Sequence, residues 1–112
     1  MALARKNRLT KKKDIDAVFD RGKAVQGSFF FIKFKTNNMP ESRMNFVVST
    51  RVLPRAVDRN RVKRILSETA RKYFRGRSDT GHDISVVIKK KGEEPVLIAE
   101  LTKLLSSTLS YG

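Results

Sequence analysis

Residues 57–75 constrain the fold of this 112-residue chain most, because they combine a helical apolar period with an almost uniformly basic surface. At 3.6 residues per turn, the apolar side chains of this segment would share one side of a helix. That stripe comprises Val62, Ile65, Leu66, Thr69 and Tyr73. The opposite side would carry Asn60, Arg64, Ser67, Arg71 and Arg75. The pattern predicts a helix that packs through one side and presents cations on the other.

The cations are densest at the start of this helix, where five basic residues of positions 55–64 face a single acid, Asp58. Like charges at helical spacing destabilise a helix, and an anionic partner is the simplest compensation. The planar guanidinium group of arginine pairs with a phosphate through two hydrogen bonds. An ordinary solvated helix face is the other explanation, but such a face normally mixes signs. Here Glu68 is the only acid from Arg59 to Arg75.

The charge of the whole chain supports an anionic partner. Twenty-five basic residues against eleven acidic residues give a net charge of +14. Nucleic acid is the first candidate partner and an anionic membrane surface is the second. No stretch approaches the roughly 18 apolar residues of a membrane span, and the basic start has no signal-peptide pattern. The absence of cysteine excludes disulfides and thiolate metal sites, and we expect a cytoplasmic protein.

The remaining periodic segments predict a small α+β domain that covers residues 1–112, with residues 1–9 as a basic N-terminal arm. Thr10 would cap a first helix that ends at Gly22, and Gly76 would cap the basic helix. Pro95 suits the first turn of a last amphipathic helix. The expected strands cover residues 29–36, 43–51 and 83–90, the last with an apolar run typical of a strand covered on both faces.

The order helix, strands, helix, strand, helix predicts a two-layer sandwich in which three helices pack on a small mixed β-sheet. The short turn at residues 37–40 predicts antiparallel pairing of strands 29–36 and 43–51. The basic helix joins two strands and implies one parallel pairing, for which the general rule gives a right-handed crossover.

The strand at residues 29–36 suggests a second binding surface. Phe30, Ile32 and Phe34 share one face and are expected in the core. The other face would combine two aromatic rings with two cations, namely Phe29, Phe31, Lys33 and Lys35. Single-stranded RNA is bound by such a combination of stacking and cationic contacts. The alternative is a face covered by the first helix, with lysines that discourage edge pairing.

Groups for acid–base or nucleophilic catalysis are sparse. His82 is the only histidine, and its place between Gly81 and Asp83 predicts a surface turn. Asp16 and Asp20 have i, i+4 spacing and could together hold a cation, although balancing nearby lysines is the simpler role. No Gly-rich phosphate loop or nucleophile elbow is present. The sequence therefore predicts a binding protein without catalytic residues.

Residues 56–64 resemble the arginine–asparagine–arginine signature of the bacterial ribonuclease P protein subunit. The similarity extends to Leu66, Glu68 and Arg71, to the first-helix segment around Val18 and Gly22, and to the end of the chain. The resemblance implies the protein subunit of a ribonucleoprotein endonuclease that removes the 5′ leader of precursor tRNA. Catalysis would belong to the RNA subunit and its magnesium ions, and the crossover around the basic helix would be left-handed.

The resemblance also assigns partners and residues. The partners would be the catalytic RNA subunit and precursor tRNA, with no membrane and no obligate protein partner. The residues expected to bind the catalytic RNA are Arg51, Arg55, Arg59, Asn60, Arg61, Lys63, Arg64 and Arg71. The residues expected to bind the leader are Ile15, Phe19, Phe31 and Lys33. No catalytic or metal-binding residue is expected on the protein.

Some positions depart from the family pattern. Ile15 stands where an aromatic residue is common, Asn45 replaces a usual glycine, and Pro54 is unusual in its loop.

Two other classes of protein share the charge and size of this chain. A ribosomal-type RNA-binding protein without a role in cleavage would have the same layout. A DNA-binding module would need a helix clear of its own core, whereas basic flanks on both sides of the stripe favour broad phosphate contact.

Overall fold

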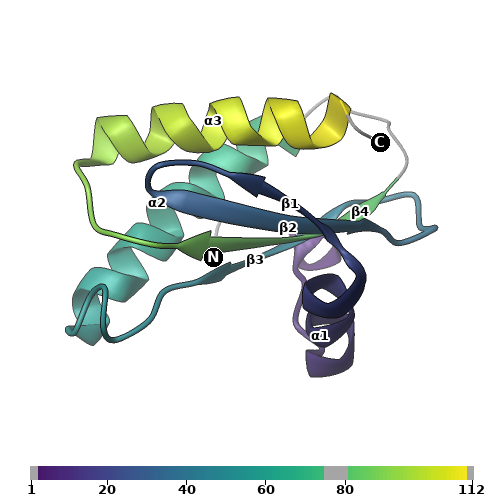
Figure 1. Cartoon of the computed structure of the whole chain (residues 1–112), viewed down its shortest axis with the longest axis horizontal. Helices are drawn as coiled ribbons and strands as arrows, with labels where there is room; N and C mark the ends of the chain where they lie inside the picture. Colours follow the sequence, from purple (N-terminus) through teal and green to yellow (C-terminus); the bar gives the residue numbers. More distant parts are fainter. Residues whose placement is uncertain (1–2, 75–80, 111–112) are drawn as a thin grey trace.

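The computed structural model describes residues 3–74 and 81–110, and within these ranges the chain forms three α-helices and a four-stranded mixed sheet (Figure 1). The helices are α1 (Lys12–Arg21), α2 (Ala56–Phe74) and α3 (Glu94–Ser110). The strands are β1 (Lys23–Gln26), β2 (Phe30–Thr36), β3 (Arg43–Val47) and β4 (His82–Ile88). The α+β class is confirmed. The expected cap Gly76 and the cation Arg75 lie outside the described residues.

The sheet has the order β1-β2-β4-β3, so the predicted direct pairing of residues 29–36 with 43–51 is wrong. β4 lies between these two strands, antiparallel to β2 and parallel to β3. Six of its seven residues are buried, and a strand with apolar side chains on both faces is best covered in the middle of a sheet. Burial of β4 between two strands therefore decides the strand order, although the connection between β2 and β3 is short.

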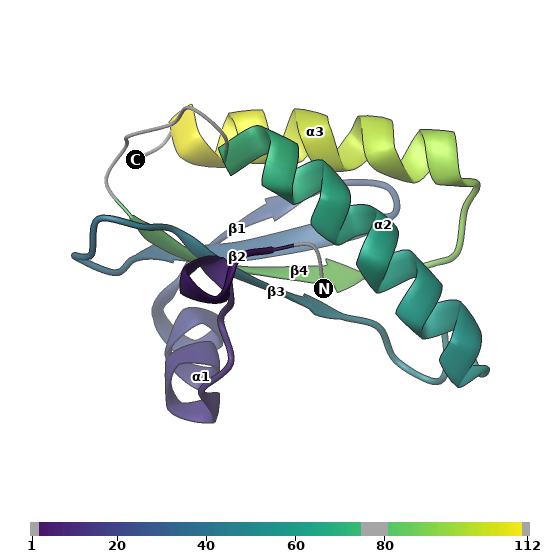
Figure 2. The same ribbon diagram turned by 180° about the vertical axis from the view of Figure 1, so that it is seen from behind.

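The segment β3-α2-β4 forms the parallel crossover. In Figure 2, α2 lies in front of the sheet, β3 and β4 both run from left to right, and β4 lies above β3. This arrangement is a left-handed crossover. It agrees with the family resemblance and differs from the right-handed rule.

Strand β1 was not predicted, because it has only four residues, of which three are exposed, and so carries almost no periodic signal. It pairs antiparallel with β2 through a tight hairpin in which Gly27 N–H donates to the Phe30 carbonyl over 2.8 Å. The carboxylate of Glu100 from α3 accepts hydrogen bonds from the backbone N–H groups of Ser28, Phe29 and Phe30 at 2.7–3.1 Å. A distant glutamate therefore fixes this turn.

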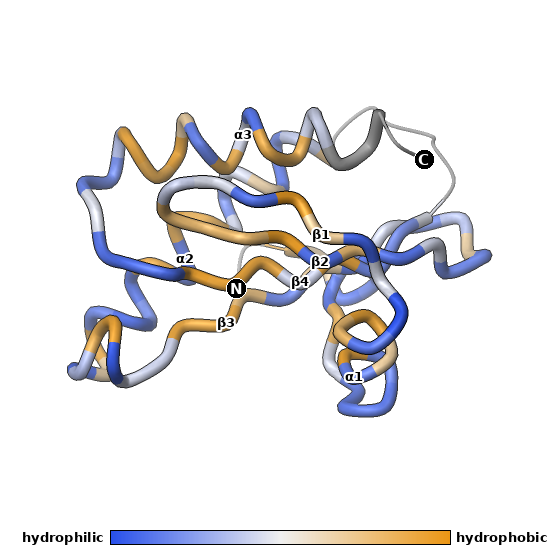
Figure 3. Tube along the Cα trace, viewed as in Figure 1, coloured by the Kyte–Doolittle hydropathy of each residue, from blue (hydrophilic) through white to orange (hydrophobic). Residues whose placement is uncertain are grey.

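The main core lies on one face of the sheet, against α2 and α3. Phe30, Ile32 and Phe34 alternate into it as predicted, and β4 adds Ile84 and Val86. The helices contribute Leu66, Ala70, Leu97, Leu101, Leu104 and Leu105. Figure 3 shows this composition as hydrophobic colour along β2 and its neighbours. No described helix is long and apolar enough to cross a membrane.

Helix α1 lies at the other face of the sheet, near one end. Its Val18 is fully buried. The predicted cap Thr10 is wrong, because the helix begins at Lys12 and Lys11 holds the capping position without a side-chain hydrogen bond. Gly22 ends the helix as expected. A Cβ atom at Gly22 would collide with the carbonyl oxygens of Val18 and Phe34, so the close approach of α1 to the sheet requires glycine there.

The buried side of α2 is rotated slightly from the predicted stripe. Leu66, Ser67 and Ala70 are buried, whereas Ile65 and Thr69 are half-buried. Ser67 was expected on the polar side. Its hydroxyl instead donates to the Lys63 carbonyl at 2.6 Å, which satisfies the buried group within the helix.

The segment before α1 lies along the outer edge of β3. Leu3 and Leu9 are buried, and the turn between them is a 3₁₀ helix over Arg5–Asn7. Arg8 bridges Met44 in parallel fashion, and Leu9 N–H donates to the Met44 carbonyl at 3.0 Å. The basic residues of this segment are thereby held beside β3.

Candidate nucleic-acid interface

The exposed side of α2 gathers most of the cations that the sequence indicated. Asn60, Arg61, Arg64 and Arg71 are exposed, and so is Lys72. Arg51 and Arg55 are exposed in the loop that leads into the helix. Arg64 makes no hydrogen bond or ion pair with any residue that the structure describes. This surface therefore combines a rigid backbone with several guanidinium groups, which is the arrangement that phosphate contacts require.

The side chains of Arg59 and Lys63 are less exposed than those of the other cations on this surface. Both are half-buried. Arg59 Nη1 donates to the carbonyls of Leu53 at 2.9 Å and Pro54 at 2.8 Å. Arg59 therefore holds the loop before α2 as well as contributing charge.

Two cations of the surface are engaged with acids. Arg61 Nε and Nη2 each lie 2.8 Å from one carboxylate oxygen of Glu94, the first residue of α3. Arg71 pairs with Glu68 at 3.0 Å, three residues earlier on α2. All four side chains are substantially exposed, and such pairs contribute only about 0–1 kcal/mol each. A phosphate group can therefore displace either acid at small cost.

The second predicted surface lies on the opposite face of the sheet. Phe31 and Lys33 of β2 are half-buried there, directly opposite Val87 and Ser85 of β4. Lys33 Nζ donates to the Gly22 carbonyl at the end of α1 over 3.4 Å. Ile15 and Phe19 of α1 are also half-buried. The structure thus places Phe31 and Lys33 on one face and sets the end of α1 beside Lys33.

Phe29 does not belong to this face, so its predicted position is wrong. It precedes β2 and packs against the main core, where Lys90 Nζ lies 5.0 Å from its ring centroid. The hairpin geometry fixed by Glu100 turns Phe29 out of the strand alternation. One aromatic ring, Phe31, therefore remains on the face.

A charge network attaches α1 to the sheet. Arg43 donates from Nε and Nη2 to both carboxylate oxygens of Asp83, at 2.8 and 2.7 Å. Its Nη1 lies 3.3 Å from Asp14 in the first turn of α1. Asn37 Nδ2 donates to Asp83 at 2.9 Å. The hydrogen bond with Asp83 raises the pKa of Arg43 above its ordinary value, and the charges of Asp83 and Asp14 act in the same direction against desolvation.

The sequence did not indicate this network, because Arg43 and Asp83 are forty positions apart and neither stands in a motif. The only available signal was that both charged residues stand at the first position of an expected strand, 43–51 for Arg43 and 83–90 for Asp83. The parallel register places these two positions directly opposite each other.

The acids and the histidine that the structure describes form no metal-binding cluster. Within residues 3–74 and 81–110, no three His, Asp or Glu side chains come together in a way that could hold a metal ion. The prediction that His82 lies in a surface turn is wrong: it begins β4 and is 4% exposed, with its ring 6.3 Å from that of Phe34. Asp16 and Asp20 are exposed on α1, beside Lys12, Lys13 and Arg21.

Comparisons with known proteins all indicate the same family. The family model described as Ribonuclease P matches residues 3–109. The ribonuclease P protein component of Vesicomyosocius okutanii is 28% identical over 112 residues, covering 97% of this chain and 96% of that protein. Its counterpart in Thermotoga petrophila is 34% identical over 83% of this chain and 78% of its own length. The Legionella pneumophila component is 36% identical, but the match spans only 61% of that relative's length.

Solved structures agree with the sequence relatives. The RNase P protein from Thermotoga maritima superimposes with a TM-score of 0.78 at 30% identity, covering 88% of this chain and 96% of that one. A Staphylococcus aureus RNase P protein gives a TM-score of 0.83 at 21% identity, which supports the fold alone. The resemblance first seen in residues 56–64 is thereby confirmed across nearly the whole sequence. The chain belongs to the ribonuclease P protein family.

Proposed function

We propose that this chain is the protein subunit of a ribonuclease P that matures the 5′ end of tRNA. The observation that carries the proposal is the family match over residues 3–109, and the charge of +14 supports an RNA partner. The family match favours this role over that of a ribosomal-type RNA-binding protein. Such a subunit would work where tRNA is processed, in the cytoplasm.

The catalytic RNA subunit would contact the exposed side of α2 and the loop before it. The contacting residues would be Arg51, Arg55, Arg59, Asn60, Arg61, Lys63, Arg64 and Arg71. Exposed Arg64 offers all of its donors to phosphate, whereas Arg61 would exchange Glu94 for phosphate. Arg59 would contribute chiefly by holding the loop through Leu53 and Pro54. These contacts position the RNA without reading its sequence.

The 5′ leader of precursor tRNA would lie against the other face of the sheet. Phe31 provides a half-buried ring for base stacking, and Lys33 provides a nearby cation for the backbone. Ile15 and Phe19 would border the leader from α1. The network of Arg43, Asp83 and Asp14 supports this proposal, because it holds α1 at the edge of that face.

The magnesium ions that cleavage requires are assigned to the RNA subunit, which would carry out the hydrolysis. The protein would act by binding both RNAs and by holding them in register. Its contribution would therefore appear as substrate affinity, and not as a step of bond cleavage.

The test compares the affinities of precursor and mature tRNA in the assembled holoenzyme. Stacking on one ring is worth roughly 1–3 kcal/mol, so Phe31→Ala should lower the precursor-to-mature affinity ratio by about tenfold or somewhat more. Lys33→Ala should also lower the ratio. Lys103→Ala is the matched control, because Lys103 is exposed on α3, away from this face.

The outcomes separate binding from folding. Phe31→Leu should keep the apolar packing and still lose stacking, so it should resemble Phe31→Ala in the ratio. Equal losses for both tRNAs would indicate defective assembly. An unchanged ratio in both Phe31→Ala and Lys33→Ala would refute the leader contact.

A further inference from the structure

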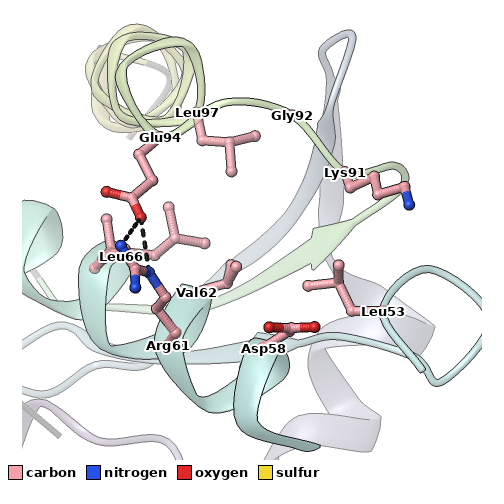
Figure 4. Close-up of a pocket in the computed structure, with 10 residues that line it drawn as sticks. Leu53, Asp58, Arg61, Val62, Leu66, Lys91, Gly92, Glu94 and Leu97 are labelled. Atoms are coloured by element: carbon pink, nitrogen blue, oxygen red, sulfur yellow. Dashed lines mark hydrogen bonds and ion pairs between the residues drawn. The ribbon is translucent and has the colours of Figure 1, made fainter. Parts of the chain in front are cut away.

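A hollow of about 230 Å³ lies between the first half of α2 and the start of α3 (Figure 4). Its wall is apolar, and Figure 4 shows Leu53, Val62 and Leu97 around the space from three different elements. Leu66 and Leu97 are buried, whereas Leu53 and Val62 are half-buried. The volume is below the roughly 300–1,000 Å³ of pockets for drug-sized ligands. It therefore suits one small ring system.

The rim of the hollow is polar. The ion pair between Arg61 and Glu94 closes one side, and Lys91 stands on the other side. Asp58 is half-buried between them in the first turn of α2. Its carboxylate has no hydrogen-bond or ion-pair partner among the described residues. The carboxylate is not a buried unsatisfied group, so its oxygens remain accessible to a ligand at the mouth of the hollow, within a surface that is otherwise cationic.

We propose that this hollow binds a single unpaired guanine base of an RNA strand. The inference rests on the proposed function, because the strand would belong to the RNA that covers α2. The face of the base would pack on Leu53, Val62 and Leu97. Its edge would meet Asp58, and the adjoining phosphates would lie beside the cations Arg61 and Lys91.

The chemistry of the rim selects guanine. A carboxylate offers two acceptor oxygens, and guanine alone presents an imino N–H and an amino group side by side on its Watson–Crick edge. Adenine and cytosine present an acceptor next to their amino group, and that acceptor would face the negative charge of Asp58. Unpaired bases of RNA are commonly recognised through such edges and through stacking. The surrounding cations favour a nucleotide over an apolar side chain of a protein.

The experiment is a titration of the full chain with guanosine 5′-monophosphate and adenosine 5′-monophosphate, followed by methyl NMR. We expect the guanine nucleotide to shift the methyl resonances of Leu53, Val62 and Leu97. It should bind about tenfold more tightly than the adenine nucleotide, as expected for one bidentate base contact. Inosine 5′-monophosphate lacks the amino group and should lose most of this preference, which tests the contact without any substitution.

Two variants isolate the carboxylate. Asp58→Asn should abolish the preference for guanine over adenine. Glu68→Gln is the matched control, since it removes the same charge from an exposed position of the same helix outside the hollow, and it should keep the preference. Equal binding of all three nucleotides, or a preference that survives in Asp58→Asn, would overturn the proposal. Methyl resonances that shift with the protein concentration and not with the nucleotide concentration would indicate self-association and overturn the proposal.

Binding of the catalytic RNA, measured in parallel, keeps this inference distinct from the proposed function. Tight RNA binding without a guanine response would overturn the base site and leave the subunit role intact. A guanine response without RNA binding would support the site and overturn the subunit role.

Discussion

Replacing Arg43 by methionine should lower the free energy of unfolding by about 3–5 kcal/mol, because it leaves a buried carboxylate without its cation. The side chain of Asp83 is 8% exposed and that of Arg43 is 18% exposed. After the substitution, Asp83 keeps only the hydrogen bond from Asn37 among its side-chain partners. Since domains of this size are stable by about 5–15 kcal/mol, the loss would be a large share of the total.

The expected loss in the free energy of unfolding can be divided between the two acids that Arg43 contacts. Asp14 is 31% exposed and lies 3.3 Å from Arg43, so Asp14→Asn should cost at most about 1 kcal/mol. The larger part of the loss therefore belongs to the pair of Arg43 with Asp83. Replacing both partners by apolar residues, as in Arg43→Met with Asp83→Leu, should recover most of the stability, because no buried charge is left unpaired.

Urea unfolding of the three variants is the assay, with the slope against urea checked for constancy. The pKa of Arg43 is raised in the folded state, so its stabilising charge is fully present below its ordinary pKa. That contribution would be lost only as the pH rises through the raised value. The Arg43 side chain of the unmodified protein therefore keeps its charge throughout the neutral pH range of the urea assay. A cost below about 1 kcal/mol, or a double variant as unstable as the single one, would refute the reasoning.

Four further outcomes concern the cationic surface and catalysis. Glu94→Gln should raise the affinity for the catalytic RNA a few-fold in binding assays while lowering stability by at most about 1 kcal/mol, because it releases exposed Arg61. Arg64→Ala should lower the log–log salt slope of RNA binding by about 1 without loss of stability, whereas Arg59→Ala should also lower stability by about 0.5–1.5 kcal/mol in urea unfolding through its loop contacts. The protein purified free of RNA should leave precursor tRNA uncut in a magnesium-containing gel assay, and specific 5′ cleavage there would overturn the division of roles.

The sequence predicted the elements whose signal is local. The period of residues 57–75 located α2 to within one residue at each end, and the alternation of Phe30, Ile32 and Phe34 identified the core face of β2. Both signals follow from the fixed geometry of a helix or a strand. The family signature added the left-handed crossover, which no periodicity encodes.

The predictions that were wrong concern features decided by contacts between residues that are far apart in the sequence. The order of the sheet depends on which strand gains most from two neighbours, and the connection between β2 and β3 says nothing of β4. His82 was predicted in a turn because it stands between Gly81 and Asp83, yet β2 and β3 both flank the strand that it begins. Phe29 left its predicted face because Glu100, seventy-one positions away, fixes the preceding turn.

In the candidate site, too, local features could be predicted from the sequence, whereas features set by packing could not. Residue type and spacing indicated which cations α2 presents. They could not indicate that Arg59 is half-buried against its own loop or that Arg61 faces Glu94, since both partners are set by packing. The hollow beside Asp58 is formed by α2, the loop before it and the start of α3, and it exists only once these segments meet.

The two proposed RNA contacts lie on opposite sides of the molecule, and this geometry limits how the RNAs can be arranged. Helix α2 covers the core face of the sheet, so its exposed cations point away from the face that carries Phe31 and Lys33. One straight RNA segment cannot touch both. The protein would therefore lie between the catalytic RNA on the α2 side and the leader on the other side. Because the core separates these surfaces, Arg64→Ala and Lys33→Ala should combine additively, as independent sites do. Strong coupling between the two substitutions would mean that a single RNA surface wraps around an edge of the sheet, and the division into two contacts would have to be abandoned.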